Sequence, residues 1–287
     1  MNLAHIIDDH DADSTALIAR GRTTTYGELR EQVERIRGGL ASLGVADGDR
    51  VALVLGNSPQ FVVSYLATLG LGAVAVPLNP TSPGPELESE LGVVSAKVVV
   101  IDKTSALNWS HVDPALLPTV DAVVSTEGSS DGVVGYDDLL ASAEARGIDD
   151  VEPSHLAVLM FTSGTAGAPR AAMLTHGNLV SNLDQSLSAQ DHIDADDVIY
   201  GVLPLFHIFG LNVVIGLGLR VGATLVLVQR FDPSTAIQSI QDRGITVIPG
   251  APALWASFAH FDDLAPDAFA NVRLALSGAS RLSVSVA

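Results

Sequence analysis

Apolar positions along the chain follow two patterns, which predict helices and strands. Between residues 29 and 40 apolar side chains recur every three or four positions, and this spacing predicts an amphipathic helix that ends at Gly44. Residues 50–55 instead form a short, almost continuously apolar run, which is typical of a strand covered on both faces. The two patterns then alternate along the rest of the chain.

The same reasoning places the remaining elements. Strands are predicted at residues 73–78, 97–101, 122–125, 155–161, 198–203, 224–228, 246–248 and 274–277. Helices are predicted at residues 61–70, 86–91, 136–146, 178–190, 211–218, 233–242 and 252–259. Residues 105–118 and 126–135 are expected to be surface connections. Strands that alternate with helices predict an α/β fold with covered, mostly parallel sheets, and the lack of a clear linker favours lobes over separate domains.

Composition narrows the classes of partner. The 287 residues include 33 acidic and 15 basic side chains, for a net charge of −18, which disfavours nucleic acid and anionic membrane as partners. A polyanion must then be held by local donors such as backbone N–H groups. There is no cysteine, no cationic signal sequence at the start, and no apolar run long enough to span a bilayer. A cytoplasmic protein is expected.

A glycine- and hydroxyl-rich loop follows the predicted strand at residues 155–161. Its six residues, with two glycines and three hydroxyls, let backbone amides converge on phosphate oxygens; they are Thr162, Ser163, Gly164, Thr165, Ala166 and Gly167. Arg170 adds a permanent positive charge. The order of residues fits neither a Walker A loop nor a Rossmann fingerprint, and composition alone leaves a simple connecting turn as an equal alternative.

The order of residues around this loop decides between the alternatives. Residues 161–170 (Phe-Thr-Ser-Gly-Thr-Ala-Gly-Ala-Pro-Arg) and 173–179 (Met-Leu-Thr-His-Gly-Asn-Leu) resemble the signature of the adenylate-forming superfamily, which includes acyl- and aryl-CoA synthetases. Ala166, Arg170 and Ala171 stand where the family usually has threonine, lysine and glycine. Because arginine and lysine contact phosphate differently, a changed affinity for ATP or a changed rate is expected.

Other segments resemble motifs of the same family, in the same order. Residues 24–29, 56–61 and 72–80 resemble its first helix entry, a strand-to-helix turn and the next strand, and are expected to be structural. The resemblance implies that residues 1–287 form the incomplete large N-terminal AMP-binding domain, with two interleaved α/β lobes and without the small C-terminal domain.

The resemblance also implies site residues. His207 lies where the family places a histidine or aromatic residue beside the reacting carboxylate; a histidine between two aromatic residues is more often part of a core, but the motif register favours the functional role. The residues matched to the acyl pocket are Pro249, Gly250 and Trp255, with a purely structural role as an equal alternative for Trp255. Those matched to the adenine stretch are Gly278, Ala279 and Ser280.

The implied activity is that of a carboxylic acid:CoA ligase that uses ATP, Mg²⁺ and CoA through an acyl-AMP intermediate. The apolar residues 208–219 favour a fatty acid as the substrate. The family's metal-binding glutamate, ribose-binding aspartate and catalytic lysine are expected beyond residue 287, so the chain by itself is expected to be inactive. The alternatives are a non-catalytic nucleotide- or acyl-binding module, and a fatty acyl-AMP ligase that loads a carrier protein.

Overall fold

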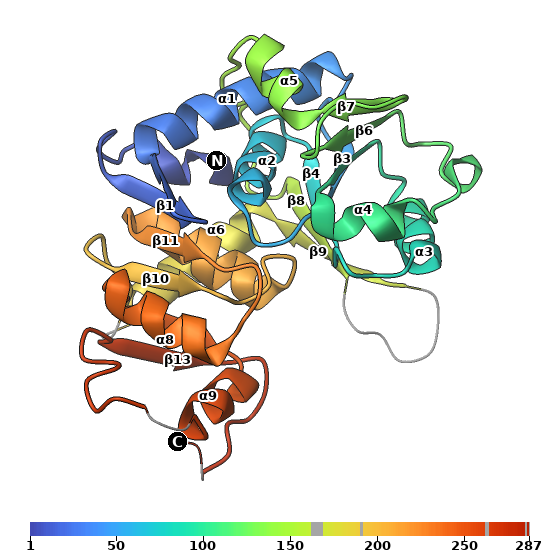
Figure 1. Cartoon of the computed structure of the whole chain (residues 1–287). Helices are drawn as coiled ribbons and strands as arrows, with labels where there is room; N and C mark the ends of the chain where they lie inside the picture. The colour runs from blue at the N-terminus through green and yellow to red at the C-terminus, as the bar shows by residue number, and fades with distance from the viewer. Residues whose placement is uncertain (162–168, 190–191, 262–263, 285, 287) are drawn as a thin grey trace. The chain divides into compact units, whose positions relative to one another are not determined.

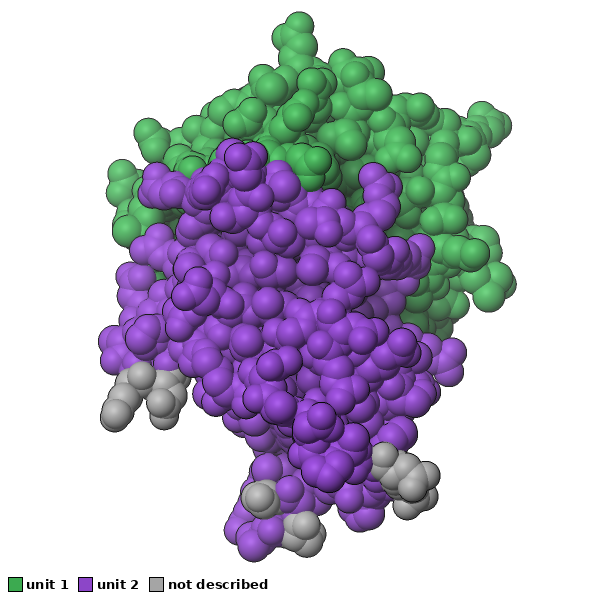
Figure 2. Space-filling view, turned by 60° about the vertical axis from the view of Figure 1, so that its left-hand side comes forward, with its two compact units in different colours: residues 1–8, 27–56, 60–182 green, residues 9–26, 57–59, 183–287 purple. Residues whose placement is uncertain are grey.

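The computed structural model describes residues 1–161, 169–189, 192–261, 264–284 and 286. The chain divides into two compact units, each made of segments that are separated in the sequence (Figure 2). Unit 1 comprises Met1–Asp8, Gly27–Gly56 and Gln60–Asn182, and unit 2 comprises Asp9–Tyr26, Asn57–Pro59 and Leu183–Ala287. In the described part of the chain, no helix has both the length and the apolar character needed to cross a bilayer.

Unit 1 is built on a seven-stranded sheet of order β7-β6-β5-β3-β4-β8-β9 (Figure 1). Every neighbouring pair is parallel except β8 and β9. The strands are β3 (Arg50–Val54), β4 (Val74–Pro77), β5 (Val98–Ile101), β6 (Ala122–Ser125), β7 (Val133–Gly135), β8 (Leu156–Phe161) and β9 (Ala171–Thr175). The helices that begin between Leu3 and His176 are η1 (Leu3–Ile7), α1 (Tyr26–Ser42), α2 (Pro59–Gly70), α3 (Gly84–Val94), α4 (Lys103–Trp109), η2 (Pro114–Leu116), α5 (Tyr136–Ser142) and α6 (His176–Leu187).

The centre of this sheet is fully buried, as the apolar runs in the sequence predict. All residues of β4 and β5 are buried, and helix α2 is buried along its length from Phe61 to Gly70. A helix that is apolar on every side must be covered on every side. Apolar side chains of α3, including Leu87 and Leu91, pack in one core cluster with strand residues such as Ala52 and Val99.

Unit 2 is built on a six-stranded sheet of order β13-β12-β10-β11-β1-β2. It is parallel except for the hairpin of β1 and β2. The strands are β1 (Thr15–Ala19), β2 (Arg22–Thr25), β10 (Val198–Gly201), β11 (Thr224–Leu227), β12 (Val247–Gly250) and β13 (Leu274–Ser277). The helices are the π-helix η3 (Gly210–Leu217), α7 (Gly218–Val221), α8 (Pro233–Asp242) and α9 (Pro252–Ala259).

Helices cover the two faces of this sheet in different ways. From β10 the chain crosses to β11 on one side, and it then returns past β10 to β12 and β13 on the other side. Because crossovers between parallel strands are right-handed, this reversal puts η3 and α7 on one face and α8 and α9 on the opposite face. Neighbouring residues of β10 show both faces: Ile199 lies against Gly218 of α7, whereas Tyr200 packs in a cluster with Ile240 of α8 and Phe258 of α9.

The predicted α/β class is confirmed, but the structure contains elements that the sequence pattern does not predict. They include η1, the β1–β2 hairpin, β7, β9, α4 and η2. Helix α4 begins after Asp102, and its C-terminal part overlaps residues 105–118, which the sequence predicts to be a connection. The carboxylate of Asp102 accepts the N–H groups of Thr104 and Ser105. This cap stabilises a short helix that has little apolar periodicity. The hairpin turns at Arg20 and Gly21, both with positive φ, as a two-residue type I′ turn requires.

Candidate functional site

His207 lies in the turn between β10 and the π-helix η3. Its backbone N–H donates to the carbonyl of Pro204 (3.1 Å), and its own carbonyl accepts the N–H of Leu211 (2.8 Å). The ring of His207 lies 4.5 Å from the ring of Phe206, measured between centroids. His207 is exposed, yet the atoms around its ring shield it from water sufficiently to lower its pKa. A neutral imidazole at pH 7 offers one N–H donor and one acceptor lone pair.

The end of β13 meets the segment that carries His207. A Cβ atom on Gly278 would fall 2.6 Å from Cζ of Phe209, so this glycine allows the backbone to lie directly against the aromatic ring. The N–H of Gly278 donates to the carbonyl of Gly250 (3.2 Å), which ties the ends of β12 and β13 together. Three predicted site segments, those of His207, Gly250 and Gly278, therefore gather at the carboxyl ends of neighbouring strands.

This gathering point is a topological switch point of the sheet. The chain leaves β10 toward the η3 face and leaves β12 toward the α9 face, although β10 and β12 are neighbours. In open α/β sheets the crevice between two such strand ends is where ligands bind. Gly201 ends β10 and Gly250 ends β12, and these glycines let neighbouring side chains pack directly against the strand ends. A Cβ would meet Leu227 and Val214 at Gly201, and Leu254 and Trp255 at Gly250.

The residues that follow Gly278 are exposed beside this switch point. Ala279 and Ser280 are both solvent-exposed, and the backbone of Ala279 has φ of 67°, a conformation that favours glycine. Pro249 is buried within β12, where it pairs with Leu276 of β13. The sequence-matched residues Pro249, Gly250, Gly278, Ala279 and Ser280 therefore lie along the two neighbouring strands β12 and β13 and the residues that follow β13.

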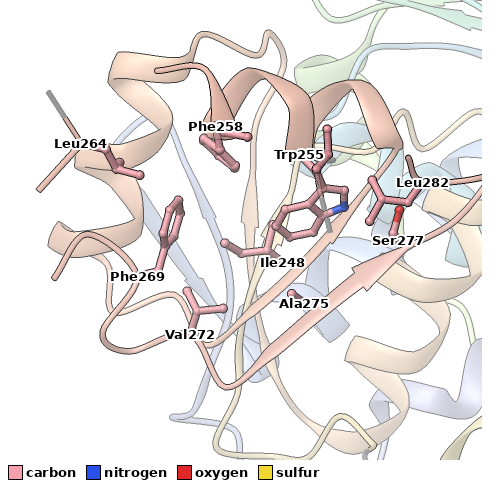
Figure 3. A pocket seen from close by; sticks show the side chains of 11 residues that line it. Ile248, Trp255, Phe258, Leu264, Phe269, Val272, Ala275, Ser277 and Leu282 are labelled. Carbon is pink, nitrogen blue, oxygen red and sulfur yellow. The ribbon is translucent and has the colours of Figure 1, made fainter. Parts of the chain in front are cut away.

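Trp255 lies on the α9 face of the same sheet. Its Nε1 is 3.2 Å from the position of a Cβ on Gly250, and it lines a cavity of about 450 Å³ together with Phe258, Phe269 and Ser277 (Figure 3). Trp255 Nε1 is buried and has no hydrogen-bond partner among the described residues. Figure 3 shows the indole nitrogen directed toward the end of the cavity where Ser277 and Leu282 lie. The structure therefore separates Trp255, on the α9 face, from Phe209, which precedes η3.

The predicted phosphate loop belongs to unit 1. Its residues Thr162, Ser163, Gly164, Thr165, Ala166 and Gly167 lie outside the described residues. The strands on either side of it, β8 and β9, are antiparallel, and Phe161 pairs with Ala171. Arg170 is exposed immediately before β9. The cation is thus solvent-accessible at the edge of the loop, as the predicted contact with phosphate requires.

Asn57 is a buried polar residue in the turn at residues 56–61, which the sequence predicts to be structural. Its side chain is 7% exposed and hydrogen-bonds to the segment that precedes His207. The available signal was its place directly after a buried strand, in the motif at residues 56–61. Spacing alone does not show that a side chain reaches backbone groups almost 150 residues away.

The chain belongs to the AMP-binding enzyme family, which it matches over residues 5–287. It is 32% identical over 263 residues to 4-coumarate–CoA ligase 3 of Oryza sativa subsp. japonica, and the match covers 91% of this chain and 47% of that relative. The chain thus spans about half the length of the curated relatives it matches.

Solved structures show the same fold. ATP-bound MatB from Rhodopseudomonas palustris is 28% identical with a TM-score of 0.87, and the match covers 100% of this chain and 56% of MatB. The anthranilate CoA ligase AuaEII, in complex with anthranoyl-AMP, has a TM-score of 0.94 at 22% identity, with coverage of 100% and 56%. This second likeness supports the fold alone.

Proposed function

We propose that this chain is the acid- and nucleotide-binding part of a carboxylic acid:CoA ligase that works through an acyl-AMP intermediate. The carboxylate attacks the α-phosphate of ATP to form acyl-AMP and pyrophosphate; the thiol of CoA then attacks the acyl carbon, which releases AMP and leaves the thioester. The observation that carries the proposal is the convergence of His207, Gly250 and Gly278 at one topological switch point, in a chain of the AMP-binding enzyme family.

Each predicted residue has a role in this reaction. The neutral ring of His207 donates a hydrogen bond to one oxygen of the carboxylate and so orients the other oxygen toward phosphorus. The backbone at Gly278, Ala279 and Ser280 lies against the adenine, because small residues allow a flat ring to approach closely. Pro249 and Gly250 border the acyl group, and Trp255 remains a predicted acyl-pocket residue.

The phosphates require separate groups. The residues at 162–167 donate backbone N–H and hydroxyl hydrogen bonds to phosphate oxygens, and Arg170 contributes positive charge. Mg²⁺ would neutralise charge that develops on the phosphates. The described residues hold no group of three or more His, Asp or Glu side chains that could share a metal ion.

The chemical class of the acid is a separate proposal. The apolar residues 208–219 led to the expectation of a fatty acid, whereas the name of the rice relative specifies 4-coumarate, an aromatic acid. The comparisons therefore give no specific support to a role in fatty acid metabolism. We propose an apolar carboxylic acid and place aromatic acids first, since they suit a site bordered by Phe206 and Phe209.

Two other activities would use the same site. A fatty acyl-AMP ligase would transfer the acyl group to a carrier protein in place of CoA, and a binding module would hold nucleotide or acid without reaction. A cytoplasmic location also remains a prediction from the sequence.

Binding and exchange measurements test the proposal. Titration calorimetry on the 287-residue chain should show binding of 4-coumarate, benzoate or hexadecanoate that His207→Ala weakens, and binding of ATP that Arg170→Ala weakens. ATP–pyrophosphate exchange should be negligible for this chain alone. If neither ATP nor any of the three acids binds, the proposed function is wrong; rapid exchange would instead refute the expectation that the chain is inactive by itself.

A further inference from the structure

Asn57 is held among backbone groups of the segment that leads to His207. Its Nδ2 donates to the carbonyls of Gly201 (3.0 Å) and Leu203 (2.8 Å), and its Oδ1 accepts the N–H of Leu205 (3.0 Å). All four residues belong to unit 2. The Asn57 side chain is the partner that the described residues offer to the carbonyl of Leu203 and the N–H of Leu205, in the irregular segment after β10. The carbonyl of Gly201, at the end of β10, also accepts the N–H of Val228 (3.1 Å), so there Asn57 adds a second hydrogen bond.

The segment that carries these three backbone groups leads directly into the turn of His207. Pro204, between the last two of them, accepts the backbone N–H of His207 (3.1 Å). The same carbonyl oxygen lies 2.2 Å from the position of a Cβ on Gly210, so the next turn is fitted closely against it. A shift of the Leu203–Leu205 backbone would therefore displace both the hydrogen bond of His207 and the start of η3.

The chemistry at position 57 requires an amide. Asparagine supplies two N–H donors and one carbonyl acceptor in one plane. Aspartate has the same shape but would direct one carboxylate oxygen at two carbonyl oxygens. Alanine would remove the side-chain partner of the Leu203 carbonyl and the Leu205 N–H and would leave the Gly201 carbonyl only its bond from Val228. The length of the side chain also matters, because glutamine is longer by one methylene group and would place its amide group at a different distance from the backbone of residue 57.

We propose that Asn57 is a positioning residue that sets the geometry of the His207 turn for recognition of the acid. This inference rests on the proposed function for the role of His207, but the hydrogen-bonded clamp can be tested without it. Asn57 does not contact the substrate in this proposal; it acts through the backbone of residues 201–205.

Amide hydrogen exchange on the 287-residue chain tests the clamp directly. Asn57→Asp should accelerate exchange at the amides of Leu205 and His207 by about 10-fold or more, because their protection depends on the local order of this turn. The amide of Gly278, which donates to Gly250, should keep its protection. Unchanged exchange at Leu205 and His207 would overturn the proposal, and equal acceleration throughout the sheet would show only a general loss of stability and would overturn it as well.

A matched control comes from Asn79. The Oδ1 of Asn79 accepts the N–H (3.0 Å) and the hydroxyl (2.8 Å) of Thr81, so among the described residues its acceptor carries the side-chain hydrogen bonds. Asn79→Asp retains that acceptor and should not change the rate of hydrogen exchange at the amides of Leu205 and His207. If Asn57→Asp does not fold, Asn57→Ser, which introduces no charge, is measured in its place with the same two expectations.

Acid binding separates this inference from the proposed function. With 4-coumarate as the probe, Asn57→Asp should weaken binding about as much as His207→Ala, and the double variant should be no weaker, because both changes remove one interaction. If exchange accelerates at Leu205 but His207→Ala leaves acid binding unchanged, the clamp stands and the proposed role of His207 fails. Additive losses in the double variant would overturn the positioning role.

Discussion

Gly278 and Phe209 lie so close that no side chain can be added to the glycine without displacing the ring. The predicted Cβ position is 2.6, 2.8 and 3.1 Å from three atoms of the phenyl ring. Two motifs separated by about 70 residues in the sequence are thereby fixed to each other at the carboxyl end of the sheet. Their contact gives the first prediction.

Gly278→Ala should destabilise the chain by about 1–3 kcal/mol, the usual cost of overpacking, as measured by urea unfolding. Replacing the ring as well, in Gly278→Ala with Phe209→Leu, should recover part of this loss because the smaller side chain makes room. Gly147→Ala is the control, since no atom lies within 4 Å of its predicted Cβ. Equal effects of the two glycine substitutions would contradict the importance of this contact.

Ala279→Gly should stabilise the chain by about 0.5–1 kcal/mol. The left-handed backbone of Ala279 costs about 1–2 kcal/mol for a residue with a Cβ, and the greater flexibility of glycine in the unfolded chain offsets part of the gain. Thermal unfolding measures the difference. Ala275→Gly, in β13, should have the opposite sign, because glycine weakens a strand of ordinary conformation.

The pH dependence of stability should include a contribution from His176, which is fully buried. Burial lowers its pKa from 6.5 to about 4, with smaller contributions from His155 and the N-terminal ammonium. Between these two values the unfolded chain binds more protons than the folded chain, so the free energy of unfolding falls as the pH decreases from 6.5 to 4. The expected loss at pH 4 is about 3 kcal/mol.

Comparison with His176→Phe isolates this contribution, since the carboxylates titrate in both proteins. The free energy of unfolding, measured in urea, should fall more steeply with acidification for the wild type than for the variant. In the folded chain Nδ1 of His176 accepts the N–H of Leu3 (3.0 Å), so the variant also loses a fixed amount of stability at every pH. Parallel pH profiles would show that the buried ring does not titrate as described.

Arg273→Ala should destabilise unit 2 by about 3–5 kcal/mol, because it leaves a buried carboxylate without its cation. Asp197 is 2% exposed and accepts hydrogen bonds from Arg273 Nε (2.8 Å) and Thr246 Oγ1 (2.6 Å). Burial by itself raises the pKa of Asp197, but these hydrogen bonds outweigh burial and hold the pKa below its usual value. Arg146→Ala is the control: its pair with Asp149 is exposed, so a loss of about 0–1 kcal/mol is expected.

Much of the fold could be predicted because burial leaves a direct mark on the sequence. The strands at the centre of the two sheets and helix α2 are predominantly apolar, and their burial follows from their composition. The β1–β2 hairpin left no such mark. Half of the residues of β2 are exposed and the others are only partly buried, so its strand depends on pairing with β1 and on the turn at Arg20 and Gly21.

The candidate site likewise has features that the sequence predicts and features that it does not. Motif order identified the segments of His207, Gly250 and Gly278, because each requires particular residue types at particular positions. The contact of Gly278 with Phe209 and the hydrogen bonds of Asn57 could not be predicted, since both depend on how distant strands align. Motif order also predicts Trp255 as an acyl-pocket residue, and this stays a prediction. Motif order could not show that helix α9 directs the indole into a cavity on the α9 face.

The place of β1 in the sheet of unit 2 has a consequence for how the chain folds. Thr15, in β1, accepts through its carbonyl the hydroxyl hydrogen bond of Thr224, in β11, and the two residues are 209 positions apart. During synthesis β1, paired only with β2, must therefore remain without its parallel partner until β11 has left the ribosome. Such long-range pairing slows folding and leaves a strand edge exposed in the meantime. Residues 183–287 expressed without the N-terminal segment would lack these two strands and should aggregate.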